Sequence, residues 1–439
     1  MQLTLQLFND GFWQDAYQLR LDKTELGRRG TVLFQPLPAY ARHYFDDVGS
    51  FSFSAQYPVN PMDIQGFKHW PAVFDDIMPM GYGRTLWLDL LGLQRETTEM
   101  QDLELLRLGT IAPVGNMRIK EAIADVASQH NNTLDSMRFP QNAVIERDQD
   151  FLNYARQRGA VSGGATGAGG AAPKLLIRLN KNAEVWVDTF QNDDSEDLHY
   201  LVKFPRGNKE IDRNILRTEY HYYCELAELG FDTMQVEHLK LLEGERNPSL
   251  WLPRFDREFS QNKVQRFGLE SVFSLLNKAP GSYLNHEDVL DTLSKVINTI
   301  SKEQLTAEYL KRDLLNLMFG NTDNHGRNSA VLKKGHQVSL APVYDFAPMK
   351  ADPETIVRTT HWSNAFERGG DVLWLKLCDS LADFGHPDYL KSELCDLAGK
   401  LSGLTNRLRK RGVPEQILTI PAMGFDYKEQ RLQRWGLLP

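Results

Sequence analysis

The chain has 439 residues, 41% of them hydrophobic and 25% charged, so it is long enough for two or three domains or for one large two-lobed enzyme. Its formal net charge of -8 gives no sign of the basic face that direct binding to nucleic acid usually requires. The three cysteines lie far apart without a Cys-x-x-Cys pair, which speaks against a disulfide framework or a structural zinc site.

Residues 1–54 alternate apolar and polar side chains in short runs punctuated by glycine, which predicts a small antiparallel sheet. The apolar period lengthens over residues 71–108 and predicts helices there. Residues 118–153 are polar and weakly periodic, so we interpret them as a connector. The N-terminus does not resemble a signal peptide and no run of 18 apolar residues occurs, so we expect a cytoplasmic protein without a membrane segment.

A glycine-rich stretch precedes the second half of the chain, in which strands give way to helices. The strand-like runs are residues 175–179, 184–187, 200–204, 329–332 and 337–340. Residues 214–229 predict a helix with Gly230 as its C-terminal cap, and the pattern after Asp256 is mostly helical. We therefore predict an α+β, two-lobed kinase-like fold: a small N-terminal subdomain (1–120), a β-rich N-terminal lobe (121–252) and a mostly helical C-terminal lobe (253–439).

The sharpest motif is residues 321–328, Asn-Thr-Asp-Asn-His-Gly-Arg-Asn. Asp323 lies five residues before Asn328, and Asp345 follows 17 residues later, across a predicted hairpin. Phosphoryl transfer needs a carboxylate near the acceptor hydroxyl and oxygen ligands that hold Mg²⁺ on the ATP phosphates, and protein kinases place them in this order. The alternative is a turn built from turn-forming residues, which the presence of Asp345 disfavours. We interpret His325 as bonding to the loop backbone or to phosphate, with a metal ligand or a general base as the alternatives.

Two further elements fit the same chemistry. The glycine run from Gly163 to Gly170 can wrap phosphate oxygens with its backbone N–H groups, although a flexible linker is the alternative. Lys203, on a predicted strand about 30 residues later, stands where a kinase keeps its ATP lysine. Glu219, on the next helix, is the best candidate for the carboxylate that orients it. A solvent-facing lysine is the alternative for Lys203.

With these elements in place, the chain resembles the HipA family, the kinase toxins of bacterial toxin–antitoxin modules. The likeness covers most of the chain and is specific from about residue 168 to residue 345. The matching segments are Pro173-Lys174-Leu-Leu, Tyr200-Leu-Val-Lys203, Glu219-Tyr220, Glu228-Leu229-Gly230, Arg254-Phe255-Asp256-Arg257, Thr322-Asp323-x-His325-x-x-Asn328 and Val343-Tyr344-Asp345.

The resemblance implies a serine/threonine kinase for protein targets, which in this family include aminoacyl-tRNA synthetases. It assigns catalysis to Asp323 and Lys203, with Asp323 as the base, and Mg²⁺ to Asn328 and Asp345. The residues implied to bind ATP are Gly169, Gly170, Ala171, Ala172, Pro173, Lys174, Lys203, Arg254, Phe255, His325, Asn328, Tyr344 and Asp345. It further implies a small DNA-binding, helix-turn-helix antitoxin of HipB type, with DNA reached only through that partner.

The sequence departs from the family pattern at two positions. Gly167 stands where the family's regulatory serine falls, so the hydroxyls left for autophosphorylation near the loop are Ser162 and Thr166. Pro253 replaces the usual glutamate before Arg-Phe-Asp-Arg, and because proline has no N–H we expect a different contact with adenine.

Two alternatives to a protein kinase remain. One is a phosphotransferase for a metabolite, an antibiotic or a lipid, because such enzymes share the Asp-x₄-Asn…Asp arrangement. The other is a scaffold that binds ATP or an antitoxin without turnover. The presence of Lys203, Asp323, Asn328 and Asp345 together disfavours this second alternative.

Overall fold

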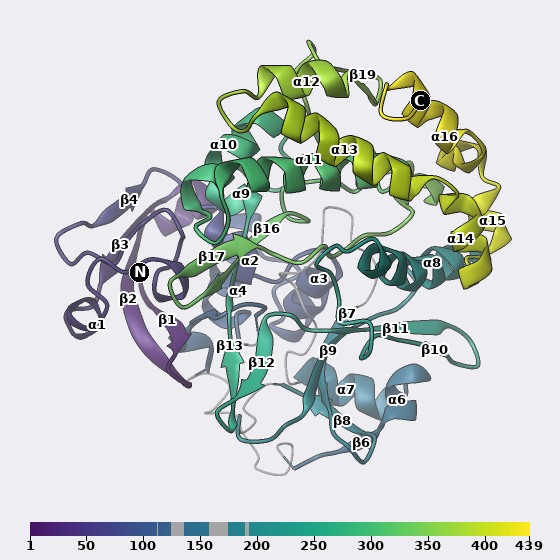
Figure 1. Cartoon of the computed structure of the whole chain (residues 1–439). Coiled ribbons are helices and arrows are strands. Elements are labelled where there is room, and N and C mark those ends of the chain that lie inside the picture. The colour runs from purple at the N-terminus through teal and green to yellow at the C-terminus, as the bar shows by residue number, and fades with distance from the viewer. Residues whose placement is uncertain (112, 124–135, 158–173, 189–192) are drawn as a thin grey trace.

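The computed structural model describes residues 1–439 apart from residues 112, 124–135, 158–173 and 189–192 (Figure 1). Of the predicted site residues, Ser162, Thr166 and residues 169–173 lie outside the described part of the chain. Within that part, no helix is both long enough and apolar enough to cross a membrane.

The chain opens with a five-stranded antiparallel sheet, drawn in purple in Figure 1, whose strand order is β4-β3-β2-β1-β5. Its strands are β1 (Gln2–Asn9), β2 (Phe12–Asp22), β3 (Thr31–Pro36), β4 (Gln65–Phe67) and β5 (Met117–Ile119). The alternation of β1 buries Leu3, Leu5 and Leu7 against the covering helices, so the predicted sheet is confirmed. The helical segments are η1 (Thr24–Arg29), α1 (Pro38–His43), η2 (Gly49–Phe51), α2 (Val73–Ile77), α3 (Gly81–Leu90) and α4 (Thr98–Leu108).

A second sheet has six strands in the order β10-β11-β9-β7-β8-β6. They are β6 (Phe139–Pro140), β7 (Lys174–Leu179), β8 (Glu184–Val187), β9 (Leu198–Lys203), β10 (Lys240–Glu243) and β11 (Pro248–Pro253). The connector predicted for residues 118–153 is wrong in part, because α6 (Gln141–Ile145) and α7 (Gln149–Gln157) form there. The apolar residues are few, but Phe151, Tyr154 and Ala155 have helical spacing and are buried against the sheet.

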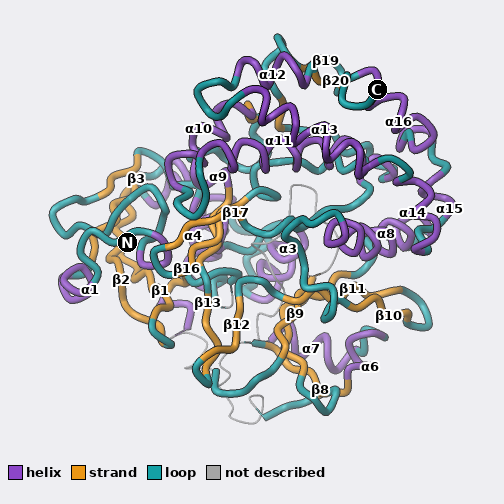
Figure 2. The backbone as a smooth tube through the Cα atoms, viewed as in Figure 1, coloured by secondary structure: helices purple, strands orange, loops and turns teal. Residues whose placement is uncertain are grey.

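A long helix, α8 (Glu210–Glu228), joins the second sheet to the helical half of the chain. A capping box between Lys209 and Asp212 fixes its start, and Gly230, in the left-handed region at φ 87°, follows its end. Figure 2 shows α8 next to β11, with the helices that follow in the chain grouped above them in this view. They are α9 (Val272–Leu275), α10 (His286–Val296), α11 (Lys302–Phe319), α12 (Trp374–Ser380), α13 (Pro387–Leu401), α14 (Leu404–Arg411), α15 (Glu415–Leu418) and α16 (Lys428–Arg434), with η3 (Met349–Ala351), η4 (Pro421–Met423) and η5 (Phe425–Tyr427).

The expectation that the chain is mostly helical after Asp256 misses several strands. The hairpin β12 (Arg257–Ser260) and β13 (Lys263–Arg266) turns through Gln261 and Asn262, both at positive φ. Such turns usually carry Asn-Gly, so this one left no clear sequence signal. The other missed strands are β14 (Gly268–Ser271), β15 (Leu284–Asn285), β18 (Thr360–His361), β19 (Glu367–Arg368) and β20 (Asp371–Val372). The strands predicted at residues 329–332 and 337–340 are confirmed as β16 (Ala330–Lys334) and β17 (Gln337–Leu340).

The described residues form three hydrophobic cores: one in the N-terminal subdomain, one on the six-stranded sheet and a large one among the C-terminal helices. The subdomain contacts β14, where the N–H of Ala55 donates to Glu270 at 2.8 Å. This is the predicted α+β, two-lobed kinase-like architecture, and its lobes meet where β7, β9 and β11 face the helices.

Candidate active site

Lys203, at the end of β9, is held by carboxylates from two other elements. Its Nζ lies 2.6 Å from Oε1 of Glu219 on α8 and also contacts Oδ1 of Asp345. Tyr223, one turn further along α8, donates to the same Glu219 oxygen at 2.9 Å. Burial opposes the charge of Lys203, but Asp345 and Glu219 together raise its pKa above the ordinary value. The contact predicted between Lys203 and Glu219 is therefore present.

Asp345 is shared by a second lysine. Lys174 on β7 lies directly opposite Lys203 on β9, and its Nζ is 3.4 Å from Oδ2 of Asp345. Burial favours the neutral acid, yet the two ammonium groups hold the pKa of Asp345 below its ordinary value. Burial lowers the pKa of Lys174. Asp345 also sits at φ 50°, in the left-handed region that few residues other than glycine adopt.

The loop that contains Asp323 follows α11 and is closed by a hydrogen bond across the motif. Gly320, at φ 70°, ends α11 and turns the chain. Nδ2 of Asn328 then donates to the carbonyl oxygen of Asp323 at 2.8 Å, which is the contact that the five-residue spacing allows. Oδ1 of Asn328 is buried and has no hydrogen-bond partner among the described residues. A buried oxygen of this kind is a ready ligand for a hard cation.

His325 fixes the loop from inside. Its Nδ1 accepts from the N–H of Arg327 at 3.2 Å, so the predicted bond to the loop backbone is confirmed. Its Nε2 lies 3.3 Å from Oδ1 of Asp323. Burial raises the pKa of Asp323, and the nearby charge of Asp345 adds to that rise while His325 opposes it. A carboxylate whose proton affinity is raised is better suited to accept a proton from a hydroxyl.

An apolar pocket opens beside these groups, and it encloses about 710 Å³ when the solvent at its mouth is included. Phe255 and Tyr344, both predicted to bind nucleotide, line it with their rings 5.6 Å apart. The lining residues are Asp76, Val114, Leu201, Lys203, Met234, Leu252, Pro253, Arg254, Phe255, Asp256, Leu269, Ser271, Arg327, Ala330, Tyr344 and Asp345. The volume is in the range of small-molecule sites.

The proline on the pocket's edge removes no hydrogen bond from the sheet. Arg254 donates its N–H to the carbonyl of His199 on β9 at 2.9 Å. In an antiparallel pair, the N–H and C=O groups of every second residue point to the partner strand, and those of Arg254 point to β9. The backbone groups of Pro253 and Phe255 therefore point away from β9. β10 begins opposite Trp251 and does not cover this edge. The carbonyl of Pro253 and the N–H of Phe255 therefore lie along the pocket's edge.

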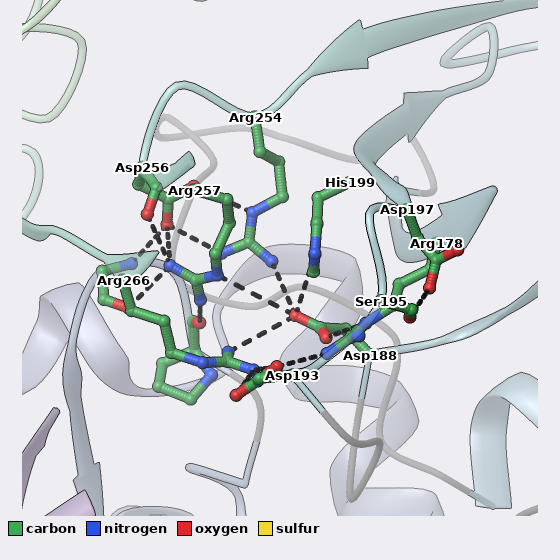
Figure 3. Close-up of polar contacts among 12 residues, drawn as sticks. Arg178, Asp188, Asp193, Ser195, Asp197, His199, Arg254, Asp256, Arg257 and Arg266 are labelled. Atoms are coloured by element: carbon green, nitrogen blue, oxygen red, sulfur yellow. Dashed lines mark hydrogen bonds and ion pairs between the residues drawn. The ribbon is translucent and has the colours of Figure 1, made fainter. Parts of the chain in front are cut away.

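Figure 3 shows a buried ion network behind this edge, which sequence analysis did not foresee. Asp256 accepts from Arg254 at 2.7 Å, from Arg257 at 2.9 Å and from the N–H of Gly115 in the N-terminal subdomain at 2.7 Å. The guanidinium of Arg254 is thus engaged in the network, although the residue also lines the pocket. The other members are Arg178, Asp188, Asp193, His199 and Arg266. Asp188 and Asp193 each lie within 3.4 Å of both Arg178 and Arg266. The network therefore holds residues 254–257, which continue from the pocket's edge, in place.

Asp313 on α11 is a second feature that the sequence did not reveal. Its Oδ1 accepts from Nη2 of Arg358 at 2.9 Å and from Nδ2 of Asn324 at 3.4 Å, and its Oδ2 accepts from Nε1 of Trp362 at 2.8 Å. Arg358 and Trp362 belong to the segment after Asp345. One buried carboxylate therefore ties α11, the Asp323 loop and that later segment together.

Asp313 is expected to act as a positioning residue for the loop. Asp313→Ala should lower the free energy of unfolding by about 3 kcal/mol, since among the described residues it leaves the buried Arg358 with Glu367 as its one carboxylate partner. It should also lower kcat at least about tenfold with little change in the KM for ATP, because the loop would lose its anchor. Urea unfolding and steady-state kinetics measure both effects, with exposed Asp291→Ala as the control. An Asp313→Ala protein with wild-type stability would contradict this role.

The chain is similar to a known protein family and to solved structures. The family model for the HipA-like C-terminal domain matches residues 166–400. A chain of the Shewanella oneidensis MR-1 toxin–antitoxin complex of HipA, HipB and operator DNA has a similar fold, with a TM-score of 0.64 and 15% identity over 99% of this chain and 96% of that one. The Helicobacter pylori proinflammatory kinase CtkA covers 62% of this chain and 89% of its own at 15% identity, but its TM-score of 0.37 is too low to support an argument.

No curated protein matches the chain by sequence. The family model nevertheless spans more than half of the 439 residues, and it includes Lys174, Lys203, Asp323, Asn328 and Asp345. The chain belongs to the family of proteins with a HipA-like C-terminal domain.

Proposed function

We propose that the chain is an ATP- and Mg²⁺-dependent protein serine/threonine kinase of HipA toxin type that phosphorylates a translation-related protein of the cytoplasm. The observation that carries the proposal is Oδ1 of Asn328, which has no partner among the described residues while its amide nitrogen donates to the backbone of Asp323. Asp345, which two lysines hold ionised, supplies a second oxygen donor. Mg²⁺ commonly takes one or two such protein ligands together with phosphate oxygens. The residues present therefore fit the ion.

Each polar group then has a role in phosphoryl transfer. The carboxylate of Asp323 accepts the proton of the acceptor hydroxyl, and His325 keeps that carboxylate in place. Lys203, oriented by Glu219, and Lys174 bind phosphate oxygens. Asn328 and Asp345 would hold Mg²⁺, which when bound with ATP neutralises charge on the transferred phosphoryl group.

The pocket's edge supports ATP as the nucleotide. Adenine presents an amino donor beside a ring-nitrogen acceptor. The carbonyl of Pro253 and the N–H of Phe255 offer the complementary acceptor and donor, while Leu252 and Ala330 supply apolar surface for the base. Proline at position 253 is compatible with this contact because the N–H that it lacks is not needed.

The similarity to a HipA–HipB–DNA complex supports a partner of HipB type. We propose that a small helix-turn-helix antitoxin binds this chain and that DNA is reached only through it. The formal net charge of -8 supports an indirect role in DNA binding. Co-purification of the chain with the product of a neighbouring reading frame would test the partnership.

Incubation with γ-labelled ATP tests the activity, first with the protein alone and then with a cell extract. Label on a protein band, recovered as phosphoserine or phosphothreonine, supports the proposal. Label that enters only a small-molecule or lipid fraction would favour a phosphotransferase of another class. ATP binding without transfer of label would indicate a scaffold.

The glycine-rich segment leads to a prediction of its own. A phosphate on this segment would add about two negative charges beside those of ATP and should silence the enzyme. Gly167 cannot accept phosphate, so we predict autophosphorylation at Ser162 or Thr166, or none in this segment. Mass spectrometry after incubation with Mg·ATP decides the matter, with Asp323→Asn as the control. Phosphate found only outside residues 160–174 would show that regulation does not run through this segment.

A further inference from the structure

The N-terminal subdomain contributes a carboxylate to the nucleotide pocket. Asp76 lies on α2, a helix whose Phe74 and Ile77 are packed into the core of the subdomain. Its neighbour Asp75 is ion-paired with Arg28 at 2.6 Å inside that subdomain. Asp76 instead lines the pocket and accepts from the N–H of Ser271 on β14 at 2.9 Å. Two adjacent carboxylates therefore serve different parts of the molecule.

Arg327, from the Asp323 loop, lines the same pocket. It is 4% exposed, and among the described residues its Nη2 has no hydrogen-bond partner. Burial raises the pKa of Asp76 to about 6, and the charge of Arg327 opposes that rise. The side chain of Asp76 is only 6% exposed. A buried carboxylate beside a guanidinium is an unusual lining for a largely apolar pocket.

The other walls of the pocket divide it into regions. Lys203 and Asp345 mark the phosphate end, and the exposed backbone edge at Phe255 marks the base end. Tyr344 stands between them: its ring is 5.6 Å from that of Phe255, and it immediately precedes Asp345 in the chain. The hydroxyl of Tyr344 donates to the carbonyl oxygen of Arg327. In the proposed placement of the nucleotide, the part of the pocket lined by Asp76 and Ser271 would face the sugar.

We infer that Asp76 forms a sugar subsite in which its carboxylate accepts hydrogen bonds from the ribose hydroxyls of the nucleotide. The inference rests on the proposed use of ATP. Asp345 can lie at the phosphate end because Lys174 and Lys203 offset its charge, whereas Asp76 has no ion pair with a lysine among the described residues and would repel a phosphate. Paired hydroxyls, in contrast, are donors that a carboxylate binds well. Arg327 favours the ionised form of Asp76 that this contact requires.

The subsite would make the N-terminal subdomain part of the nucleotide site. The N–H of Ser271 on β14 donates to Asp76 where that side chain lines the pocket. A bound nucleotide would then hold the subdomain against the loop that contains Asp323, through the contact between its sugar and Asp76. A chain without the subdomain would lose this contact while keeping Lys203 and Asp345.

Titration calorimetry of the full chain with ATP, 2′-deoxy-ATP and 3′-deoxy-ATP, each with Mg²⁺, tests the inference. The wild-type protein should bind ATP about tenfold more tightly than at least one of the deoxy nucleotides. Asp76→Asn should bind ATP about tenfold more weakly and lose the discrimination, because a neutral amide is a poorer acceptor for two hydroxyls. Asparagine keeps an oxygen for the N–H of Ser271, so this variant should fold.

Asp75→Asn is the matched control, because it removes the adjacent carboxylate from the pair with Arg28. It should lower the melting temperature and leave the preference for ATP over the deoxy nucleotides unchanged. Equal binding of ATP and both deoxy nucleotides by the wild-type protein would overturn the sugar subsite and leave the proposed kinase intact. So would an Asp76→Asn protein that keeps the wild-type preference. A wild-type protein that binds none of the three would overturn the proposed function as well.

Discussion

Asp323→Asn is expected to lower phosphoryl transfer by about a thousandfold and to change the affinity for ATP by less than about threefold. Asparagine has the size of aspartate and still faces His325, but it cannot take a proton from the acceptor. Lys203, Asn328 and Asp345, which are proposed to hold Mg·ATP, are untouched. Single-turnover transfer of labelled phosphate and titration calorimetry with ATP measure the two quantities separately.

The control for Asp323→Asn is Asp291→Asn, an exposed carboxylate on α10 that pairs with Lys295. It should retain wild-type transfer. An Asp323→Asn protein with near-normal turnover would show that another group deprotonates the acceptor. Loss of ATP binding together with transfer would show instead that Asp323 belongs to the binding site.

Those contacts of the candidate site whose residues are close in sequence could be predicted from local patterns, whereas Lys203 and Asp345, 142 residues apart, were brought together only by the resemblance to the HipA family. The five-residue spacing of Asp323 and Asn328 is itself the condition for the hydrogen bond that closes the loop. Glu219 could be placed against Lys203 because the helical period of α8 and the strand before it leave few carboxylates within reach. In these cases a local pattern determines a local contact.

The groups that sequence analysis missed act through partners that are far apart in the chain. Asp313 contacts Arg358, 45 residues away, and Asp76 contacts Ser271, 195 residues away. No periodicity records such pairs, and a buried aspartate on a helix resembles a solvated one until the opposing surface is known. The hairpin at Gln261 escaped notice for a different reason, since its turn uses positive φ without glycine.

The roles of Arg254 and Arg257 in the buried ion network could likewise not be predicted from the sequence. Arg254 and Arg257 were expected as part of a motif next to the nucleotide, yet their guanidinium groups serve buried aspartates. The motif therefore shapes the pocket's edge through its backbone. Which atoms of a motif face a ligand depends on the strand register, and that register became visible only in the folded chain.

Asp345→Ala is expected to abolish productive binding of Mg·ATP, with transfer reduced by about a thousandfold or more. The change removes one of the two oxygen donors proposed for the metal and leaves the ammonium groups of Lys174 and Lys203 with Glu219 as their shared anion. ATP should then bind with an affinity that no longer depends on Mg²⁺. Calorimetry of ATP with and without Mg²⁺, for wild-type and variant proteins, measures this dependence.

Metal removal tests the same site in the unaltered chain. Excess EDTA should reduce transfer to background, and Mg²⁺ or Mn²⁺ should restore it, because amide and carboxylate oxygens suit these ions better than zinc. Asp345→Asn serves as the matched variant: it keeps one oxygen and the side-chain volume, so Mn²⁺ at high concentration should restore part of its activity. Transfer that persists in EDTA would refute a metal-dependent kinase. Equal Mg²⁺ dependence in the wild-type and Asp345→Ala proteins would remove Asp345 from the metal site and leave Asn328 as its remaining protein ligand.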